Sequence, residues 1–341
     1  MLTVVWSGVD TLEASFRGAL ENETIARLDE LKKQAQEENL GQPFAAGPVE
    51  FLVHPAGVKP WRYLLSTEDL QLRLSVTPSI PTVSAKLLAL GLMAYGHEGL
   101  YRVAQDIAAK LGAVPAGLSR LDLAVDFQGH VPTHEEMRHV VCASGFRPVY
   151  PNTENPETFQ FGKDKLVVRL YDKTRELAKS GKTWLPFVWA QHPSYNAEEA
   201  VWRFEAQFRR PLLRDFLCAQ AEDAFARLDM LLAVALYWCS PRAPQEQNLS
   251  RCPTLPWWEE LKAASFAGKP LLRVRTENRV GSFEQLIPQA LGLLVSGAAH
   301  RGVTSLDEAQ ELQKRAMEAY LRKKGTTFAA RVEERRRRIK D

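Results

Sequence analysis

The chain has 341 residues, of which 45% are hydrophobic and 25% are charged, a composition typical of a globular protein long enough for two or three domains. Its net charge is only +3, so overall charge does not by itself indicate a nucleic-acid partner, and any such signal must be local. The four cysteines form no CxxC pair, which argues against a zinc ribbon and fits the reduced thiols of a cytoplasmic protein.

The first part of the chain is predicted to alternate strands and helices. Hydrophobic periodicity predicts a strand over residues 3–17 and a helix over 19–39 with its apolar residues on one face. Two further strands are predicted over 48–53 and 70–76, and a helix is predicted over 84–111.

The next predicted strand, residues 119–129, shows the clearest alternation in the sequence. One face carries Leu121, Leu123, Val125 and Phe127, and the other carries Arg120, Asp122, Ala124, Asp126 and Gln128. The strand repeats features of residues 7–18, namely a serine, an aspartate three residues later and a closing Phe-x-Gly. We therefore predict two related β-α-β-β units about 110 residues apart.

The remaining elements suggest where the domains end. A short helix is predicted over 133–143, followed by a hairpin that turns on residues 162–165 and a strand over 200–210. Beyond Pro211 the pattern is helical, over residues 212–238, 283–298, 305–324 and 326–339. We predict an α+β fold of two related antiparallel-sheet units with helices on one face, followed by a helical C-terminal region. The predicted domains are 1–115, 116–240 (catalytic) and 241–341 (DNA-binding).

Three predicted strands carry charged groups on the face opposite their apolar residues. The sets are Arg120, Asp122 and Asp126; Arg169, Tyr171 and Lys173; and Arg203, Glu205, Gln207 and Arg209. Carboxylates beside cations on neighbouring strands suit Mg²⁺ or Mn²⁺ next to a phosphate. Asp122 and Asp126 are roughly 13 Å apart along an extended strand, so only one of them can share an ion with Glu205, and Asp122 is preferred. The alternative is a set of cross-strand ion pairs on a solvated face.

Several common functions are not indicated. The sequence has no P-loop, no GxGxxG after a strand, no G-x-S-x-G and no His-x-His pair. The first residues lack a basic segment followed by a long apolar one, and no apolar run approaches the length of a membrane span. We therefore expect neither a signal peptide nor a membrane partner.

Four motifs occur in order: Ser-Arg-Leu-Asp-Leu-Ala-Val-Asp (119–126), Phe-Gln-Phe-Gly (159–162), Val-Arg-Leu-Tyr-Asp-Lys-x-x-Glu (168–176) and Trp-Arg-Phe-Glu-Ala-Gln-Phe-Arg (202–209). This set, across roughly residues 115–215, resembles the replication initiation factor (Rep-trans) family of plasmid and phage rolling-circle initiators. The resemblance implies a metal-dependent relaxase, an endonuclease that nicks and rejoins DNA through a 5′-phosphotyrosyl link. It also implies DNA, as double-stranded origin and nicked strand, as the partner. A host helicase and a second copy of the chain are left open as further partners.

The sequence departs from the family at the nucleophile. In plasmid members the tyrosine immediately precedes the glutamate of an Arg-Tyr-Glu strand, a position that Phe204 occupies here. Tyr171 is the preferred substitute, because Arg169 and Lys173 flank it and should favour the phenolate; Tyr195 is the second choice. Asp122 and Glu205, with Asp126 as a substitute, would bind the metal, while Arg169, Lys173 and Arg203 would hold the scissile phosphate. The alternatives are a structural or DNA-binding role for Tyr171 and a non-catalytic origin-binding protein.

Basic residues accumulate near the end of the chain. From Arg301 onward there are 12 Lys and Arg against 7 Asp and Glu, including the run Arg335, Arg336, Arg337 and Arg338. Such a run can neutralise several phosphates, so it is predicted to bind DNA together with Arg120 and Arg209. A solvated helix end is the alternative.

Overall fold

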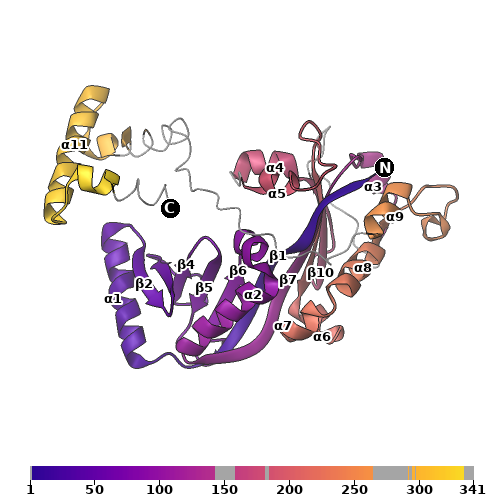
Figure 1. Ribbon diagram of the computed structural model, residues 1–341, viewed down its shortest axis with the longest axis horizontal. Coiled ribbons are helices and arrows are strands. Elements are labelled where there is room, and N and C mark those ends of the chain that lie inside the picture. Colours follow the sequence, from indigo (N-terminus) through magenta and orange to yellow (C-terminus); the bar gives the residue numbers. More distant parts are fainter. Residues whose placement is uncertain are drawn as a thin grey trace. The chain divides into compact units, whose positions relative to one another are not determined.

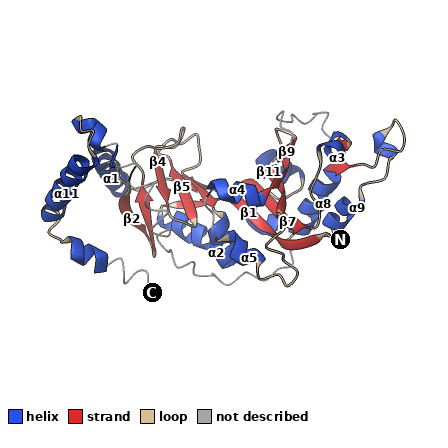
Figure 2. Cartoon of the chain, turned by 90° about the horizontal axis from the view of Figure 1, so that it is seen from above, coloured by secondary structure: helices blue, strands red, loops and turns tan. Residues whose placement is uncertain are grey.

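The computed structural model describes residues 2–142, 158–180, 184–263, 291, 294–295 and 297–333. The chain divides into two compact units, Met1–Arg273 and Val274–Asp341. The first contains a ten-stranded sheet with the order β2-β3-β4-β5-β6-β1-β7-β11-β10-β9, in which neighbouring strands are antiparallel. Figure 2 shows β2, β4 and β5 toward one end of this unit and β9 and β11 toward the other.

Two long strands form the centre of the sheet, β1 (Thr3–Gly18) and β7 (Ala113–Gln128), each of 16 residues. The strands on the β1 side are β2 (Gln42–Ala46), β3 (Val49–Val53), β4 (Tyr63–Ser66), β5 (Leu70–Leu74) and β6 (Val83–Leu87). Those on the β7 side are β9 (Thr158–Phe161), β10 (Leu166–Asp172) and β11 (Trp202–Arg209), while β8 (Val140–Cys142) and β12 (Cys239–Pro241) form a separate pair. The outer neighbour of β1 is β6, and the outer neighbour of β7 is β11. Each outer neighbour is the last strand that its half of the chain adds to this sheet. This confirms the predicted α+β fold of two related antiparallel units, whose boundaries remain predictions.

The main core lies on one face of the sheet, because alternate residues of each strand point toward it. The helices of the first unit are α1 (Asn22–Glu38), α2 (Ala89–Lys110), α3 (His134–Arg138), α4 (Lys173–Ser180), α5 (Leu185–Trp189), α6 (Arg210–Asp215), α7 (Ala221–Phe225), α8 (Leu228–Trp238), the 3₁₀ turn Leu249–Arg251 and α9 (Pro256–Lys262). Apolar residues of α1, α2 and α6–α9 join this core. Phe204 of β11, for example, meets Trp258 of α9 edge to face, with ring centres 5.6 Å apart. Burying such a side chain contributes roughly 1.5–3 kcal/mol.

A second, smaller apolar cluster covers part of the opposite face. Val5 of β1 packs there with Leu185, Val188 and Trp189 of α5, and Figure 1 shows α4 and α5 on the other side of the sheet from α1 and α2. The cluster covers only one end of β1 and β7, so the middle of this face is left to polar side chains.

Some predicted elements have different bounds in the structure. Residues 84–87, predicted to begin a helix, belong to β6, because Val83–Leu87 pairs with β1 and β5 inside the sheet, and this pairing overrides the helix-forming composition of the segment. The predicted helix over 133–143 ends at Arg138 and is followed by β8, and residues 212–238 contain three short helices. Strands β2 and β4 were not predicted.

The second unit contains α11 (Leu306–Lys323), which confirms the helix predicted over 305–324. The predicted helix over 283–298 lies mostly outside the described residues, and the one over 326–339 is described only as far as residue 333. No helix among the described residues is long and apolar enough to cross a membrane.

Candidate active site

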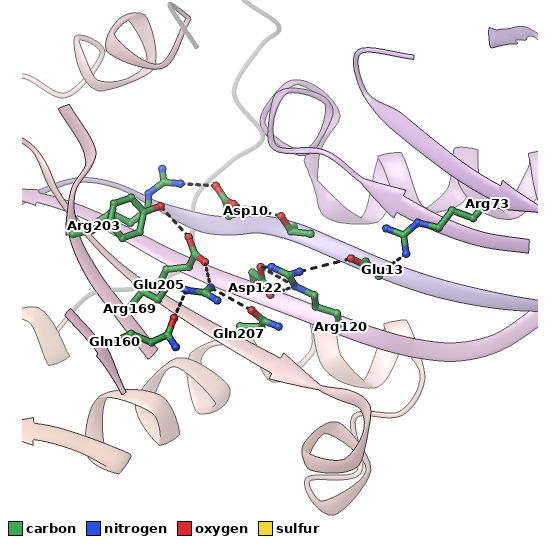
Figure 3. Close-up of polar contacts among 12 residues, drawn as sticks. Asp10, Glu13, Arg73, Arg120, Asp122, Gln160, Arg169, Arg203, Glu205 and Gln207 are labelled. Carbon is green, nitrogen blue, oxygen red and sulfur yellow. Dashed lines mark hydrogen bonds and ion pairs between the residues drawn. The ribbon is translucent and has the colours of Figure 1, made fainter. Parts of the chain in front are cut away.

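The register between β10 and β11 brings four of the predicted site residues together. Arg169 lies directly opposite Glu205, and Tyr171 lies opposite Arg203. The Glu205 carboxylate accepts a hydrogen bond of 3.0 Å from Nη1 of Arg169 (Figure 3). It also accepts one of 2.9 Å from the hydroxyl of Tyr171. This confirms the prediction, made from the period-two alternation of both strands, that these side chains lie on one face of the sheet.

Asp122 extends this polar face onto β7. Its side chain is almost fully buried, with 1% exposed, and it accepts a hydrogen bond of 2.8 Å from Nε of Arg120. Burial raises the pKa of Asp122, Arg120 lowers it, and the negative charges of Glu205 and Asp10 raise it; together these effects bring the pKa to about 7. Asp122 is thus an acid that titrates near neutrality among other carboxylates.

The third carboxylate of the cluster, Asp10, was not predicted as a site residue. Val9 of β1 pairs with Leu123 and Thr11 pairs with Asp122, so Asp10 is an extra residue at a β-bulge, a distortion that commonly re-aims a side chain near an active site. Figure 3 shows Asp10 on the same face as Glu205 and Asp122. The sequence held a signal for it, because Asp10 follows Ser7 as Asp122 follows Ser119.

Asp126 and Arg203 form a buried pair below this cluster. Nη2 of Arg203 donates to Oδ2 of Asp126 at 2.7 Å, and Nε1 of Trp189 donates to the same oxygen at 2.8 Å. Nε of Arg203 also donates to the other Asp126 oxygen, and its Nη1 donates to Asp10. Arg203 is 1% exposed and Asp126 is 0% exposed, and in this arrangement the two side chains are bonded to each other. Their hydrogen bonds fix the position of Asp10.

The surroundings of Tyr171 differ from the prediction. Lys173 is the first residue of α4 rather than a strand residue; its ammonium group pairs with Glu176 and lies 5.5 Å from the centre of the Tyr171 ring. Burial raises the pKa of the Tyr171 hydroxyl well above its ordinary value, an effect that the positive charge of Arg203 only partly offsets. The expected stabilisation of the phenolate by Arg169 and Lys173 is therefore wrong for this conformation, because both cations are occupied by carboxylates.

Phe204, at the family's nucleophile position, and Tyr195, the second-choice nucleophile, make different contacts from Tyr171. Phe204 is fully buried in the main core against Trp258, on the face that the strand alternation predicts and opposite to that of Glu205. Tyr195 packs near Trp189, with ring centres 6.1 Å apart. Among the tyrosines that the structure describes, which exclude Tyr150, Tyr171 is the one with its hydroxyl bonded to Glu205.

The predicted DNA-binding arginines fall into three groups. Arg120 is engaged by Asp122 and lies 3.8 Å from Glu13. Arg209 is exposed at the end of β11. The run Arg335, Arg336, Arg337 and Arg338 lies outside the described residues.

The carboxylates of this face are the groups that could bind a divalent metal ion. Within the described part of the chain, no three His, Cys, Asp or Glu side chains converge closely enough to hold an ion. The donor type nevertheless suits Mg²⁺ or Mn²⁺, and the three neighbouring carboxylates are each engaged by a different arginine: Asp10 by Arg203, Asp122 by Arg120 and Glu205 by Arg169. An ion would need these carboxylates to turn away from their arginines.

No family model matches the sequence, and no curated protein sequence matches it. Among solved structures, the chain is similar to a rolling circle replication initiator protein from Geobacillus stearothermophilus, with 15% sequence identity and a TM-score of 0.45. The similarity covers 77% of this chain and 96% of that chain.

Proposed function

We propose that the protein is a DNA strand transferase of the rolling-circle initiator type, which nicks and rejoins one DNA strand through a covalent tyrosyl intermediate. The observation that carries the proposal is the hydrogen bond between the Tyr171 hydroxyl and Glu205, in a cluster of carboxylates and arginines on the sheet face that lacks the main core. The ordered motifs between residues 119 and 209 support the same class of activity.

The residues have distinct roles in this mechanism. Oη of Tyr171 attacks phosphorus as its proton passes to the Glu205 carboxylate, and the bond to the 3′ oxygen breaks. Glu205 then gives that proton to the departing oxygen, which leaves a 5′-phosphotyrosyl link and a free 3′ hydroxyl. Arg169 stabilises charge on the phosphoryl oxygens. Attack by the 3′ hydroxyl on the phosphotyrosine restores the phosphodiester and returns the proton to Tyr171, so no nucleotide is consumed.

We also propose a Mg²⁺ or Mn²⁺ site formed by Asp10, Asp122 and Glu205, with Asp10 in place of Asp126. When bound, such an ion would polarise the phosphoryl oxygens of the substrate. Binding can be measured without activity, by the rise in melting temperature that Mn²⁺ gives to the wild type. Asp10→Asn should reduce this rise, whereas Asp106→Asn on the exposed side of α2 should leave it unchanged.

A second candidate function is origin binding without cleavage. It is favoured by Phe204, which occupies the nucleophile position of plasmid initiators but lies in the core, and by the burial that disfavours a Tyr171 phenolate.

The two functions are distinguished with supercoiled plasmid that carries the gene's own region, incubated with the protein and Mn²⁺ or Mg²⁺. A metal-dependent nick with DNA attached to a Tyr171 peptide is the result expected of the enzyme. In Glu205→Ala, cleavage should be lost while DNA binding is retained. Binding by the wild type without a nick or adduct would favour the non-catalytic function.

A further inference from the structure

Four arginines lie toward the ends of β1 and β11 that are remote from α5, with Arg209 level with Glu13 across β7 and Arg17 four residues further along β1. Arg17 is the last residue but one of β1, and Arg209 is the last of β11. Arg210 and Arg214 lie one turn apart on α6. Nη2 of Arg210 donates to Oγ of Ser15 at 2.9 Å, which ties the start of α6 to β1 beside Arg17. We call these four residues the arginine cluster.

The cluster carries positive charge that no carboxylate balances among the described residues. Elsewhere on this face arginines are matched with acids, as in the ion pairs of Arg73 with Glu13, Arg120 with Asp122 and Arg169 with Glu205. No such ion pair holds any arginine of the cluster in the described part of the chain. Burial, followed by repulsion from Arg214 and Arg17, lowers the pKa of Arg210. Like charges placed together destabilise a fold, so the arrangement calls for an anion that comes from outside.

The position of the cluster relates it to the candidate active site. Glu205, Gln207 and Arg209 alternate along one face of β11, so Arg209 lies roughly 13 Å from Glu205 along the strand. On β1, Ser15 and Arg17 follow Glu13 on the same face by the same alternation. A distance of roughly 13 Å corresponds to about four nucleotides of one strand of a duplex.

We propose that Arg17, Arg209, Arg210 and Arg214 bind the sugar–phosphate backbone of DNA a few nucleotides from the phosphate that Tyr171 attacks. This inference rests on the proposed function, since the cluster would act as an anchor for the same DNA strand. Guanidinium groups suit the task because they bind phosphate oxygens in pairs. The interaction would be independent of base sequence and weakened by salt. Arg120 is not part of the site, because Asp122 already engages it.

The test compares two variants that remove the same charge. Arg17→Gln, Arg209→Gln and Arg214→Gln are combined in one protein, which leaves the Arg210–Ser15 hydrogen bond intact. The control combines Arg27→Gln, Arg62→Gln and Arg102→Gln, three arginines whose partners are Glu30, Asp29 and Glu98. Binding of a fluorescein-labelled 30-nucleotide single strand is measured between 50 and 300 mM NaCl, about the range over which binding to phosphates weakens strongly, and melting temperatures are measured in parallel.

We expect the cluster variant to melt as the wild type does and to lose about tenfold or more in affinity at low salt. The slope of log K against log salt should fall by about 0.7 for each phosphate that the variant no longer binds, or roughly 2 in total. The control should keep most of the wild-type slope. Equal slopes and affinities for the cluster variant and the control would overturn the proposal. An effect seen with RNA of the same sequence but not with DNA would overturn the assignment to DNA.

The same proteins separate this inference from the proposed function. If the wild type does not cleave but the cluster variant alone loses salt-sensitive binding, the cluster binds DNA and the catalytic proposal is wrong. If the wild type cleaves and the cluster variant binds and cleaves as well as the control, the catalytic proposal stands and the arginine cluster has no role in binding.

Discussion

The hydroxyl of Tyr171 and the carboxylate of Glu205 are joined by a hydrogen bond of 2.9 Å between adjacent strands. Glu205 therefore lies where it can accept the proton that Tyr171 must lose to act as a nucleophile. The acceptor is itself held by Arg169, so the geometry of the pair is fixed by the β10–β11 register rather than by a loop.

Tyr171→Phe should abolish the covalent DNA adduct while DNA binding remains. Phenylalanine keeps the ring and loses only the hydrogen bond to the Glu205 carboxylate, which costs about 1.5–3 kcal/mol of stability. Denaturing gel electrophoresis of protein incubated with nicked or supercoiled DNA measures the adduct. Tyr195→Phe is the matched control and should retain it. An adduct in Tyr171→Phe that disappears in Tyr195→Phe would assign the nucleophile to Tyr195.

Phe204→Tyr should not restore activity to Tyr171→Phe. The added hydroxyl would enter the main core beside Trp258, on the face opposite to Glu205, where an unpaired polar group costs about 1–3 kcal/mol. Urea unfolding measures the loss in stability, and the adduct assay measures rescue. Rescue by Phe204→Tyr would show that β11 presents its other face to DNA.

Arg203→Met should destabilise the fold far more than Arg169→Met. Arg203 pairs with both Asp126 and Asp10 in a buried site, and removing one partner of a buried ion pair costs about 3–5 kcal/mol. Arg169 is 29% exposed, so solvent can compensate its loss and the cost should stay near 1 kcal/mol. Free energies of unfolding from urea titrations test the difference. Equal losses would show that Arg203 contributes no more than a partly exposed pair.

Asp122 should make the fold less stable as the pH rises toward neutrality. The pKa of Asp122 is about 7 in the folded chain and has its ordinary value of about 4 in the unfolded chain. Between these pH values the folded state binds more protons, so the free energy of unfolding falls as pH rises, by at most about 1.4 kcal/mol for each unit of pKa difference.

The comparison that isolates this effect uses Asp122→Asn, with Asp106→Asn as an exposed control. Asparagine cannot ionise, so Asp122→Asn should lose part of the decline in stability between pH 4.5 and 7.5, roughly the interval between the two pKa values. Urea unfolding across that interval gives the slopes. Identical slopes in Asp122→Asn and the wild type would show that the pKa of Asp122 is not raised.

Cys142 and Cys239 should form a disulfide when the protein is oxidised. They are direct partners in the β8–β12 register, and the Cys142 thiol lies close enough to add to the effect of burial in raising the pKa of Cys239. Opposed residues in an antiparallel pair have Cβ atoms about 4.5–5.5 Å apart, within small adjustments of disulfide geometry. Oxidised glutathione would take up two electrons and two protons, giving two reduced glutathione molecules. Peptide mapping should find this link, with Cys218 and Cys252 still reduced; a link to either of those would contradict the register.

Period-two alternation was sufficient to predict which side chains of β7, β10 and β11 share a face, because successive side chains of a strand point to opposite faces of the sheet. It could not predict Asp10, since the bulge between Val9 and Thr11 depends on pairing with β7. It also extended the β10 strand as far as Lys173, where the chain has already turned into a helix.

Charges were harder to assign than faces. The sequence shows that Arg203 and Arg209 are on one side of β11, but not that the first is enclosed by two aspartates while the second is exposed. Ion pairing and burial depend on neighbours that are distant in sequence, such as Asp126 and Trp189 around Arg203. For the same reason, the arginine cluster joins residues nearly 200 positions apart, as the bond between Arg210 and Ser15 shows.

The seam between β1 and β7 can be viewed as an internal dimer interface. The two strands have equal length and pair antiparallel along it, which is the relation that a two-fold axis imposes on identical subunits. Asp10 comes from one half, and Asp122 and Glu205 come from the other. The acidic cluster therefore belongs to neither half alone and exists only because the two halves join edge to edge in one continuous sheet.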